Sequence, residues 1–187
     1  MAQLEKMIPF LILWESGVAD TAADNETLFL KARSKGVVKD PADRGGATLA
    51  GVTIATYGDY SKRKGRRKPS VADLARLEYA EWFDILKTMF WDRWQADSIA
   101  DQRVAHMLVD WVWTSGTYGI TIPQKLLGVK ADGIVGPKTL EAVNAMVPSE
   151  LFLNLKASRS AYFERICRQR PANRRFLNGW LRRLNAI

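Results

Sequence analysis

The sequence has one cysteine, one histidine and no long apolar run. With Cys167 alone, neither an intramolecular disulfide nor a cysteine-based metal cluster can form. With His106 alone, multi-histidine metal sites are excluded and a Ser-His-Asp triad is disfavoured. The longest apolar run, residues 8–14, contains Pro9 and is too short to span a membrane. The N-terminus also lacks the regions of a signal peptide, so we expect a protein made in the cytoplasm with no membrane span.

What the sequence does contain is typical of a globular protein. Its 187 residues are 47% hydrophobic and 26% charged, which suits one domain or one domain with a smaller second part. A chain of this size buries about 70% of the surface that its unfolded form exposes, so it needs no disulfide to stabilise its core. Seven tryptophans are an unusually large number, and we expect them in the core or in a binding cleft.

The net charge of +8 is concentrated in two segments. Residues 156–187 hold nine Lys or Arg against one acid, and six of the seven residues 62–68 are basic. Such a field favours a polyanionic partner, namely nucleic acid, anionic lipid or bacterial cell wall; a solvated helix face with a mobile loop is the alternative. Because Gly58–Pro69 has no apolar anchor, we expect an exposed, mobile loop. Its neutralisation should weaken wall binding and barely change stability.

Hydrophobic periodicity predicts helices along most of the chain. The predicted helices are residues 4–16, with a kink or late start at Pro9, and then 24–35, 70–86, 98–115, 137–146, 148–170 and 174–184. The only β-branched run is 50–56, which follows a turn-rich stretch at 39–46. We therefore predict a mostly α fold with at most a small β-hairpin within 38–56 and a soft boundary near 95–98.

Glu15 is the first candidate for chemistry. It lies at the C-terminal end of an apolar helix, beside Trp14. The negative end of the helix dipole and an apolar neighbour both disfavour ionisation, which suits a general acid that works near neutral pH. A solvated glutamate at a helix end is the alternative interpretation.

The second candidate is the segment 40–53, which contains Asp43, Gly46 and Thr48. Its paired glycines allow a tight turn and a close approach of substrate to the backbone. Asp43 and Thr48 stand at either end of that turn and could position a water if they face Glu15. An ordinary β-turn has the same composition, so this pattern alone is weak.

Together the two segments resemble glycoside hydrolase family 108, a family of N-acetylmuramidases. The sequence pattern of that family has a helix that ends in Glu-Gly-Gly, followed by the motif Asp-Pro-x-Asp-x-Gly-Gly-Ala-Thr-x-x-Gly-Ile/Val-Thr. Three later segments continue the resemblance in order: the aromatic segment 90–94, the helix 104–116 that carries Asp110, and the closing segment 176–183. Residues 124–140, with Asp132-Gly133, resemble the peptidoglycan-binding region that follows the catalytic part in this family. The Asp-Gly turn itself is read as mainly structural.

The resemblance implies a lysozyme-like helical domain at 1–95 and a helical peptidoglycan-binding part at 96–187 packed against it. It implies Glu15 as general acid, with Asp43 and Thr48 positioning water or stabilising an oxocarbenium-like transition state, and no cofactor or metal. The substrate contacts that we expect are Gly46, Trp91, Trp94, Asp110 and Trp113. Core packing is the preferred interpretation for most of the tryptophans, and for His106 and Cys167.

Three features depart from the family pattern. Glu-Gly-Gly is Glu-Ser-Gly here, Thr114 stands where the family often has Asn, and some 19 residues, 18–36, are inserted after Gly17. The insertion brings Asp20, Asp24 and Glu26 near the cleft in sequence, and any of them could replace Asp43 as the second catalytic group.

The leading functional hypothesis is a monomeric muramidase that cleaves the β-1,4 bond between N-acetylmuramic acid and N-acetylglucosamine. Its partners are bacterial peptidoglycan and anionic wall polymers, which it would reach in the periplasm after export or lysis. One rival is a non-catalytic basic protein that binds nucleic acid or cell wall through 62–68 and 156–183. Another is a secretion-associated protein whose lysozyme-like site has decayed. No base-reading motif supports nucleic acid, so none is expected as a partner.

Overall fold

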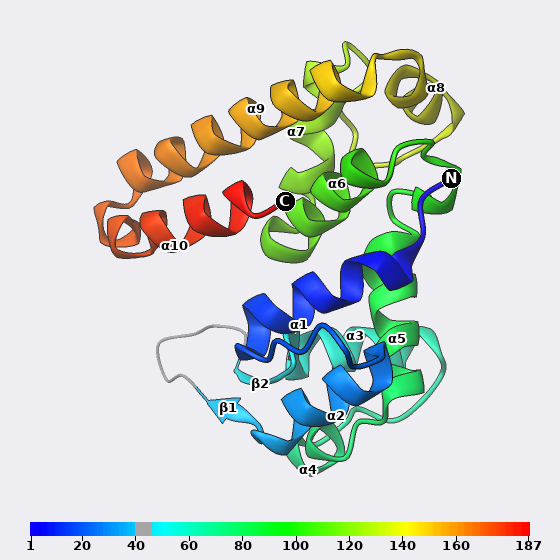
Figure 1. Ribbon diagram of the computed structural model, residues 1–187, viewed down its shortest axis with the longest axis vertical. Coiled ribbons are helices and arrows are strands. Elements are labelled where there is room, and N and C mark those ends of the chain that lie inside the picture. Colours follow the sequence, from blue (N-terminus) through cyan, green and yellow to red (C-terminus); the bar gives the residue numbers. More distant parts are fainter. Residues whose placement is uncertain (40–45) are drawn as a thin grey trace. The chain divides into compact units, whose positions relative to one another are not determined.

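A computed structural model describes residues 1–39 and 46–187 of the chain (Figure 1). Contacts divide the chain into two compact units, one formed by Leu4–Met89 and the other by Met1–Gln3 with Phe90–Ile187. The chain is mostly helical with one small antiparallel sheet, as the sequence predicted, although the described residues form three short strands and not a two-stranded hairpin. The proposed division into a catalytic part, 1–95, and a binding part, 96–187, stays a prediction.

The unit Leu4–Met89 contains all three strands (Figure 1). Its elements are the 3-10 turn η1 (Leu4–Met7), α1 (Ile8–Ser16), α2 (Asn25–Ser34), β1 (Val38–Lys39), β2 (Ala47–Leu49), β3 (Val52–Thr53), α3 (Ile54–Arg63), α4 (Val71–Ala75) and α5 (Tyr79–Leu86). A π-helical segment, η2 (Lys87–Trp91), follows α5. The core of this unit is formed by α1, α2 and α5, whose apolar side chains include the fully buried Ile8, Phe29 and Trp82.

Helix α1 shows how Pro9 sets the start of a helix. The first residues form a 3-10 turn, and Pro9 then occupies the first turn of α1, where its missing N–H costs no hydrogen bond. Of the two alternatives predicted for Pro9, the structure therefore shows a late start of the α-helix and not a kink within it. The helix ends at Gly17, whose backbone lies in the left-handed region with φ of 69° and whose N–H donates to Leu13 O at 2.8 Å.

The sheet is held by one tight turn and one buried tryptophan. Strand β2 pairs antiparallel with both β1 and β3, with Thr48 opposite Val38 on one side and Thr53 on the other. The connection from β2 to β3 is only Ala50-Gly51, and both residues have positive φ. The indole N–H of Trp82 donates to Ala50 O at 3.1 Å, which anchors this turn to the core. The predicted strand 50–56 is thus shorter than expected, because α3 begins at Ile54.

The structure corrects the prediction of a loop at Gly58–Pro69 in its first half only, because residues 64–69 lie outside the helices and residues 62–68 are exposed, as expected. Helix α3 continues to Arg63, and it buries Tyr57 and Tyr60 one turn apart on a single face. The following residues are also tied down, because Arg67 pairs with both oxygens of Asp73 at 2.9 and 2.8 Å. Further ion pairs join Lys64 to Asp84 and Arg66 to Glu81. The segment therefore has apolar anchors, and about half of its cations have acidic partners.

The second unit is entirely helical in its described elements. Beyond the end of η2 it contains the 3-10 turn η3 (Ala96–Ser98), α6 (Gln102–Ser115), α7 (Tyr118–Leu126), α8 (Pro137–Ala145), α9 (Pro148–Gln169), the 3-10 turn η4 (Pro171–Asn173) and α10 (Arg174–Asn185). The start of α6 differs slightly from the prediction, since Asp101, not Ser98, caps the helix by accepting from Val104 N. None of the described helices is long and apolar enough to cross a membrane.

Helices α6 and α7 pack closely because residue 119 is a glycine. A Cβ at Gly119 would lie only 2.4 Å from the backbone nitrogen of Val112. The carbonyl of Gly119 also accepts from the indole N–H of Trp94 at 3.2 Å. This contact fixes the aromatic segment after η2 against the α6–α7 pair.

Candidate active site

Glu15 lies in the last turn of α1, and its side chain is partly exposed. The adjoining helix end is fixed by Gly17 and by Ser16, whose hydroxyl donates to Ile12 O at 2.7 Å. Lys35, from the end of α2, donates to the carbonyl of Ser16 at 2.7 Å. The sequence predicts that the negative end of the α1 dipole acts on Glu15. The positive charge of Lys35 offsets part of that negative potential.

The turn that carries Gly46 and Thr48 belongs to the same unit as Glu15. Gly46 has a φ of 72°, and a Cβ there would lie 3.3 Å from Cγ2 of Ile54, so the position favours glycine in both conformation and space. Thr48, in β2, is partly exposed, and its hydroxyl donates to Gly46 O at 3.3 Å. Figure 1 shows the strands at the same end of this unit as the C-terminal end of α1.

A hollow of about 440 Å³ lies along α3, next to Gly46. Ile54, which would meet a Cβ at residue 46, forms part of its wall. The lining residues are Ile54, Ala55, Gly58, Asp59, Lys62, Arg66 and Lys68. This lining combines two apolar side chains with one acidic and three basic ones, so it offers polar groups to a ligand.

Asp43 lies outside the described residues, so its distance to Glu15 is not part of the structure. The acids of the 18–36 insertion are described, and two of them have local structural roles. Asp20 forms an ion pair with Lys31 at 2.5 Å, and Asp24 caps α2 by accepting from Thr27 N at 2.7 Å. These contacts lower the pKa of both carboxyls, that of Asp20 mainly through Lys31 and that of Asp24 mainly through the backbone N–H of Thr27.

The structure places Trp91 and Trp94 in the interior, where they have no exposed surface. The indole of Trp91 donates to Asp97 at 2.8 Å, and that of Trp94 donates to Gly119 O. A side chain without accessible surface has no face on which a sugar could stack, so substrate contact by these two residues is not supported. They contribute to core packing, the alternative that the sequence favoured. Trp113 is partly exposed, and its ring centroid lies 4.5 Å from that of Phe90.

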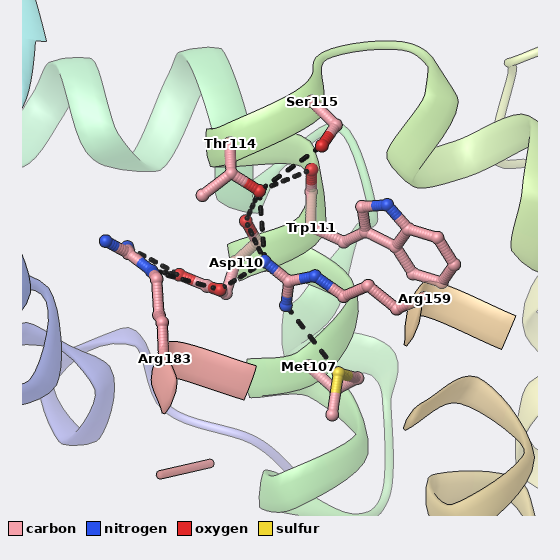
Figure 2. Close-up of polar contacts among 7 residues, drawn as sticks. All are labelled: Met107, Asp110, Trp111, Thr114, Ser115, Arg159 and Arg183. Atoms are coloured by element: carbon pink, nitrogen blue, oxygen red, sulfur yellow. Dashed lines mark hydrogen bonds and ion pairs between the residues drawn. The ribbon is translucent and has the colours of Figure 1, made fainter. Parts of the chain in front are cut away.

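Asp110 is also fully buried, which corrects its expected role in binding substrate. Figure 2 shows its carboxylate between two arginines from other helices. Arg159 of α9 donates to Oδ2 at 2.7 Å, and Arg183 of α10 donates to Oδ1 at 2.7 and 3.1 Å. Burial by itself would raise the pKa of Asp110, but the two guanidinium groups outweigh it and hold that pKa below its usual value. Asp110 therefore joins α6, α9 and α10.

His106 lies one turn before Asp110 on α6 and is mostly buried. Burial lowers the pKa of His106 to about 4, and Arg183 and Arg159 act in the same direction while Asp110 opposes them. Its folded-state pKa is below the unfolded value of 6.5, so the unfolded state binds the proton more tightly between pH 6.5 and 4. The stability that neutral His106 contributes is present above pH 6.5 and is lost as the pH falls through this window.

We therefore expect the free energy of unfolding of the wild-type protein to decrease as the pH falls from 6.5 to 4. This decrease should exceed that of the His106→Gln variant over the same range by about 3 kcal/mol. Because the chain has no other histidine, the imidazole proton signals in an NMR titration report this group alone. A midpoint near 6.5 in the folded protein would contradict the burial argument.

The Asp132-Gly133 turn is structural, as its sequence indicated. The side-chain NH₂ of Gln124, which is fully buried, donates to Ile134 O at 2.9 Å and to Asp132 at 3.2 Å. The Gln124 carbonyl in turn accepts from Gly133 N at 2.9 Å. This network fixes the connection between α7 and α8.

Sequence reasoning missed Asp59 and Lys62, which line the hollow along α3. With Ala55 they follow the i, i+4, i+7 spacing of one helical face. The sequence shows that spacing, but the predicted loop at 58–69 excluded a helix on which these residues would share a face. Among the described residues, no group of three His, Cys, Asp or Glu side chains is arranged to hold a metal ion.

Comparisons with known proteins match two consecutive parts of the chain to two families. The family model described as Glycosyl hydrolase 108 matches residues 30–116, and the model described as Predicted Peptidoglycan domain matches residues 118–185. The first match contains Asp43, Gly46 and Thr48 but begins after Glu15. No curated protein matches the chain. Among solved structures, that of Brucella abortus SagA is 31% identical, with a TM-score of 0.68 over 86% of this chain and 91% of that one.

Proposed function

The chain belongs to the glycosyl hydrolase 108 family and carries a peptidoglycan-binding domain, and on this premise we propose that it is an N-acetylmuramidase. Its substrate is the β-1,4 bond between N-acetylmuramic acid and N-acetylglucosamine in bacterial peptidoglycan. It acts on the wall in the periplasm after export or lysis.

The observation that carries this proposal is the position of Glu15. A partly exposed carboxyl group stands in the last turn of a helix whose other face is buried, and Gly17 and Lys35 fix that helix end. Glycosidic cleavage needs an acid that protonates the leaving oxygen and a second carboxylate across the bond. Glu15 supplies the acid. The turn with Gly46 and Thr48, beside the hollow along α3, leaves room for the sugar chain.

Asp43 is the second carboxylate in this proposal, and Thr48 assists it in positioning water. Asp20 and Asp24 each already hold a local structural contact, which argues against either as a substitute. We expect Asp43→Asn to reduce the rate of wall cleavage about 10²-fold or more, whereas Asp20→Asn leaves it within about threefold of wild type. Initial rates of turbidity loss on purified peptidoglycan measure both. A larger loss from Asp20→Asn would transfer the role to the insertion.

The reaction itself is tested by the ends that it creates. The purified protein is incubated with peptidoglycan, the soluble products are reduced with borohydride, and the reduced sugar is identified by mass spectrometry. A muramidase yields reduced N-acetylmuramic acid at every new end. Reduced N-acetylglucosamine would identify a glucosaminidase, and new amino groups without new reducing ends would show cleavage of the peptide.

A further inference from the structure

The unit that contains Phe90–Ile187 has a basic groove that neither the proposed active site nor the buried arginines use. It lies between α7 and α9, which pack against each other (Figure 1), and its volume is about 340 Å³. Its charged residues are Lys125 of α7 and Arg165 and Arg168 of α9, and its lining also includes Ile122 and Tyr162. None of the described residues that line it is acidic.

The three cations share one opening because of helical spacing. Ile122 and Lys125 are three positions apart on α7, and Arg165 and Arg168 are three positions apart on α9, so each pair lies on one face of its helix. Figure 1 shows the two helices adjoining. Like charges gathered in this way repel one another, and an anionic ligand would relieve that repulsion.

The rest of the basic segment is different. Arg159 and Arg183 are buried against Asp110 and are not available to a ligand at the surface. By contrast, within the described chain Lys125, Arg165 and Arg168 are exposed and form no ion pair, although Arg165 lies 5.4 Å above the ring of Tyr162. That stacking holds one guanidinium at the groove with its edge available for a carboxylate.

We propose that this groove binds the carboxylate groups of the peptidoglycan stem peptide. The inference rests on the proposed function for its choice of ligand, since peptidoglycan carries short peptides with several free carboxylates along an uncharged sugar chain. Arginine forms paired hydrogen bonds with carboxylates, and the groove falls within the ~300–1,000 Å³ range of small-ligand sites. The apolar surface of Ile122 and Tyr162 in the groove suits the alkyl side chains between those carboxylates.

The test compares two triple variants of the full chain with the same change in charge. The groove variant is Lys125→Gln/Arg165→Gln/Arg168→Gln. The control is Arg170→Gln/Arg174→Gln/Arg182→Gln, whose side chains are exposed in the same unit and line none of the described hollows. Calorimetric titration with a synthetic tetrapeptide stem is carried out at low salt. The same peptide with its carboxylates amidated, sugar chains without peptides, and a short DNA duplex are titrated in parallel.

We expect the groove variant to bind the free stem peptide about tenfold more weakly than wild type, and the control variant to bind within about twofold of wild type. The amidated peptide and the bare sugar chain should show no dependence on the groove. Equal losses in both variants would overturn the proposal in favour of a general basic field. Undiminished binding of the amidated peptide, no binding of the stem peptide, or a groove effect on DNA alone would also overturn it.

The stem peptide contains no glycosidic bond, so this result is independent of cleavage. If the protein fails to release muramic acid ends and the groove effect is still present, the proposed reaction fails while the binding site remains. If cleavage occurs and the groove variant binds normally, only the groove assignment fails.

Discussion

The Glu15→Gln protein is expected to lose wall cleavage by about 10²–10⁴-fold or more while it folds normally. Glutamine is nearly the same size as glutamate and forms similar hydrogen bonds, but it has no proton to give to the leaving oxygen. Glu15 is partly exposed at the end of α1, so the substitution leaves the buried face of the helix, with Ile8, Leu11 and Ile12, unchanged. Turbidity loss on purified peptidoglycan measures the rate, and thermal unfolding measures the fold.

Glu5→Gln is the matched control. Glu5 is an exposed acid in η1, in the same unit, and its replacement should leave cleavage within about twofold of wild type. Near wild-type clearing by the Glu15→Gln protein would refute the assignment of the acid. Loss of cleavage together with a much lower melting temperature would instead identify Glu15 as a structural residue.

Replacing Asp110 by asparagine should destabilise the second unit by about 3–5 kcal/mol, because it leaves two arginines facing a neutral group in the interior. Arg159 is 1% exposed and Arg183 9% exposed, so water cannot compensate for the lost carboxylate. Three helices meet at this network (Figure 2), and the effect should appear in unfolding of the whole unit. Urea unfolding followed by tryptophan fluorescence measures it, since Trp111 lies beside Asp110 on α6.

The control for this prediction is Glu164→Gln, an exposed acid on α9 that should change the free energy of unfolding by less than about 0.5 kcal/mol. A third variant separates charge from packing. In Asp110→Leu/Arg159→Met/Arg183→Met all three charges are removed together, and much of the lost stability should return, as apolar replacements of buried ion clusters often achieve. A change of under 1 kcal/mol in Asp110→Asn would show that the network contributes little.

Local signals in the sequence determined most of the secondary structure. Pro137 and Pro148 open α8 and α9, as predicted, because proline fits the first turn of a helix. Ser70 and Asp73 form the expected capping box at the start of α4. These features depend only on residues within a few positions of one another, so periodicity and capping rules identify them. The helical fold and its small sheet followed from such signals, whereas the family resemblance rested on motif residues such as those of Glu15–Gly17 and of residues 40–53.

Only the tertiary structure decided which polar and aromatic side chains are buried. Asp110 was expected to contact substrate, yet its partners Arg159 and Arg183 lie 49 and 73 positions away in sequence. The same basic run that suggested a uniform field divides into these two buried arginines and the exposed groove residues Arg165 and Arg168. Periodicity shows which residues share a helical face. It does not show which helix will cover that face, because burial depends on contacts between segments that are distant along the chain.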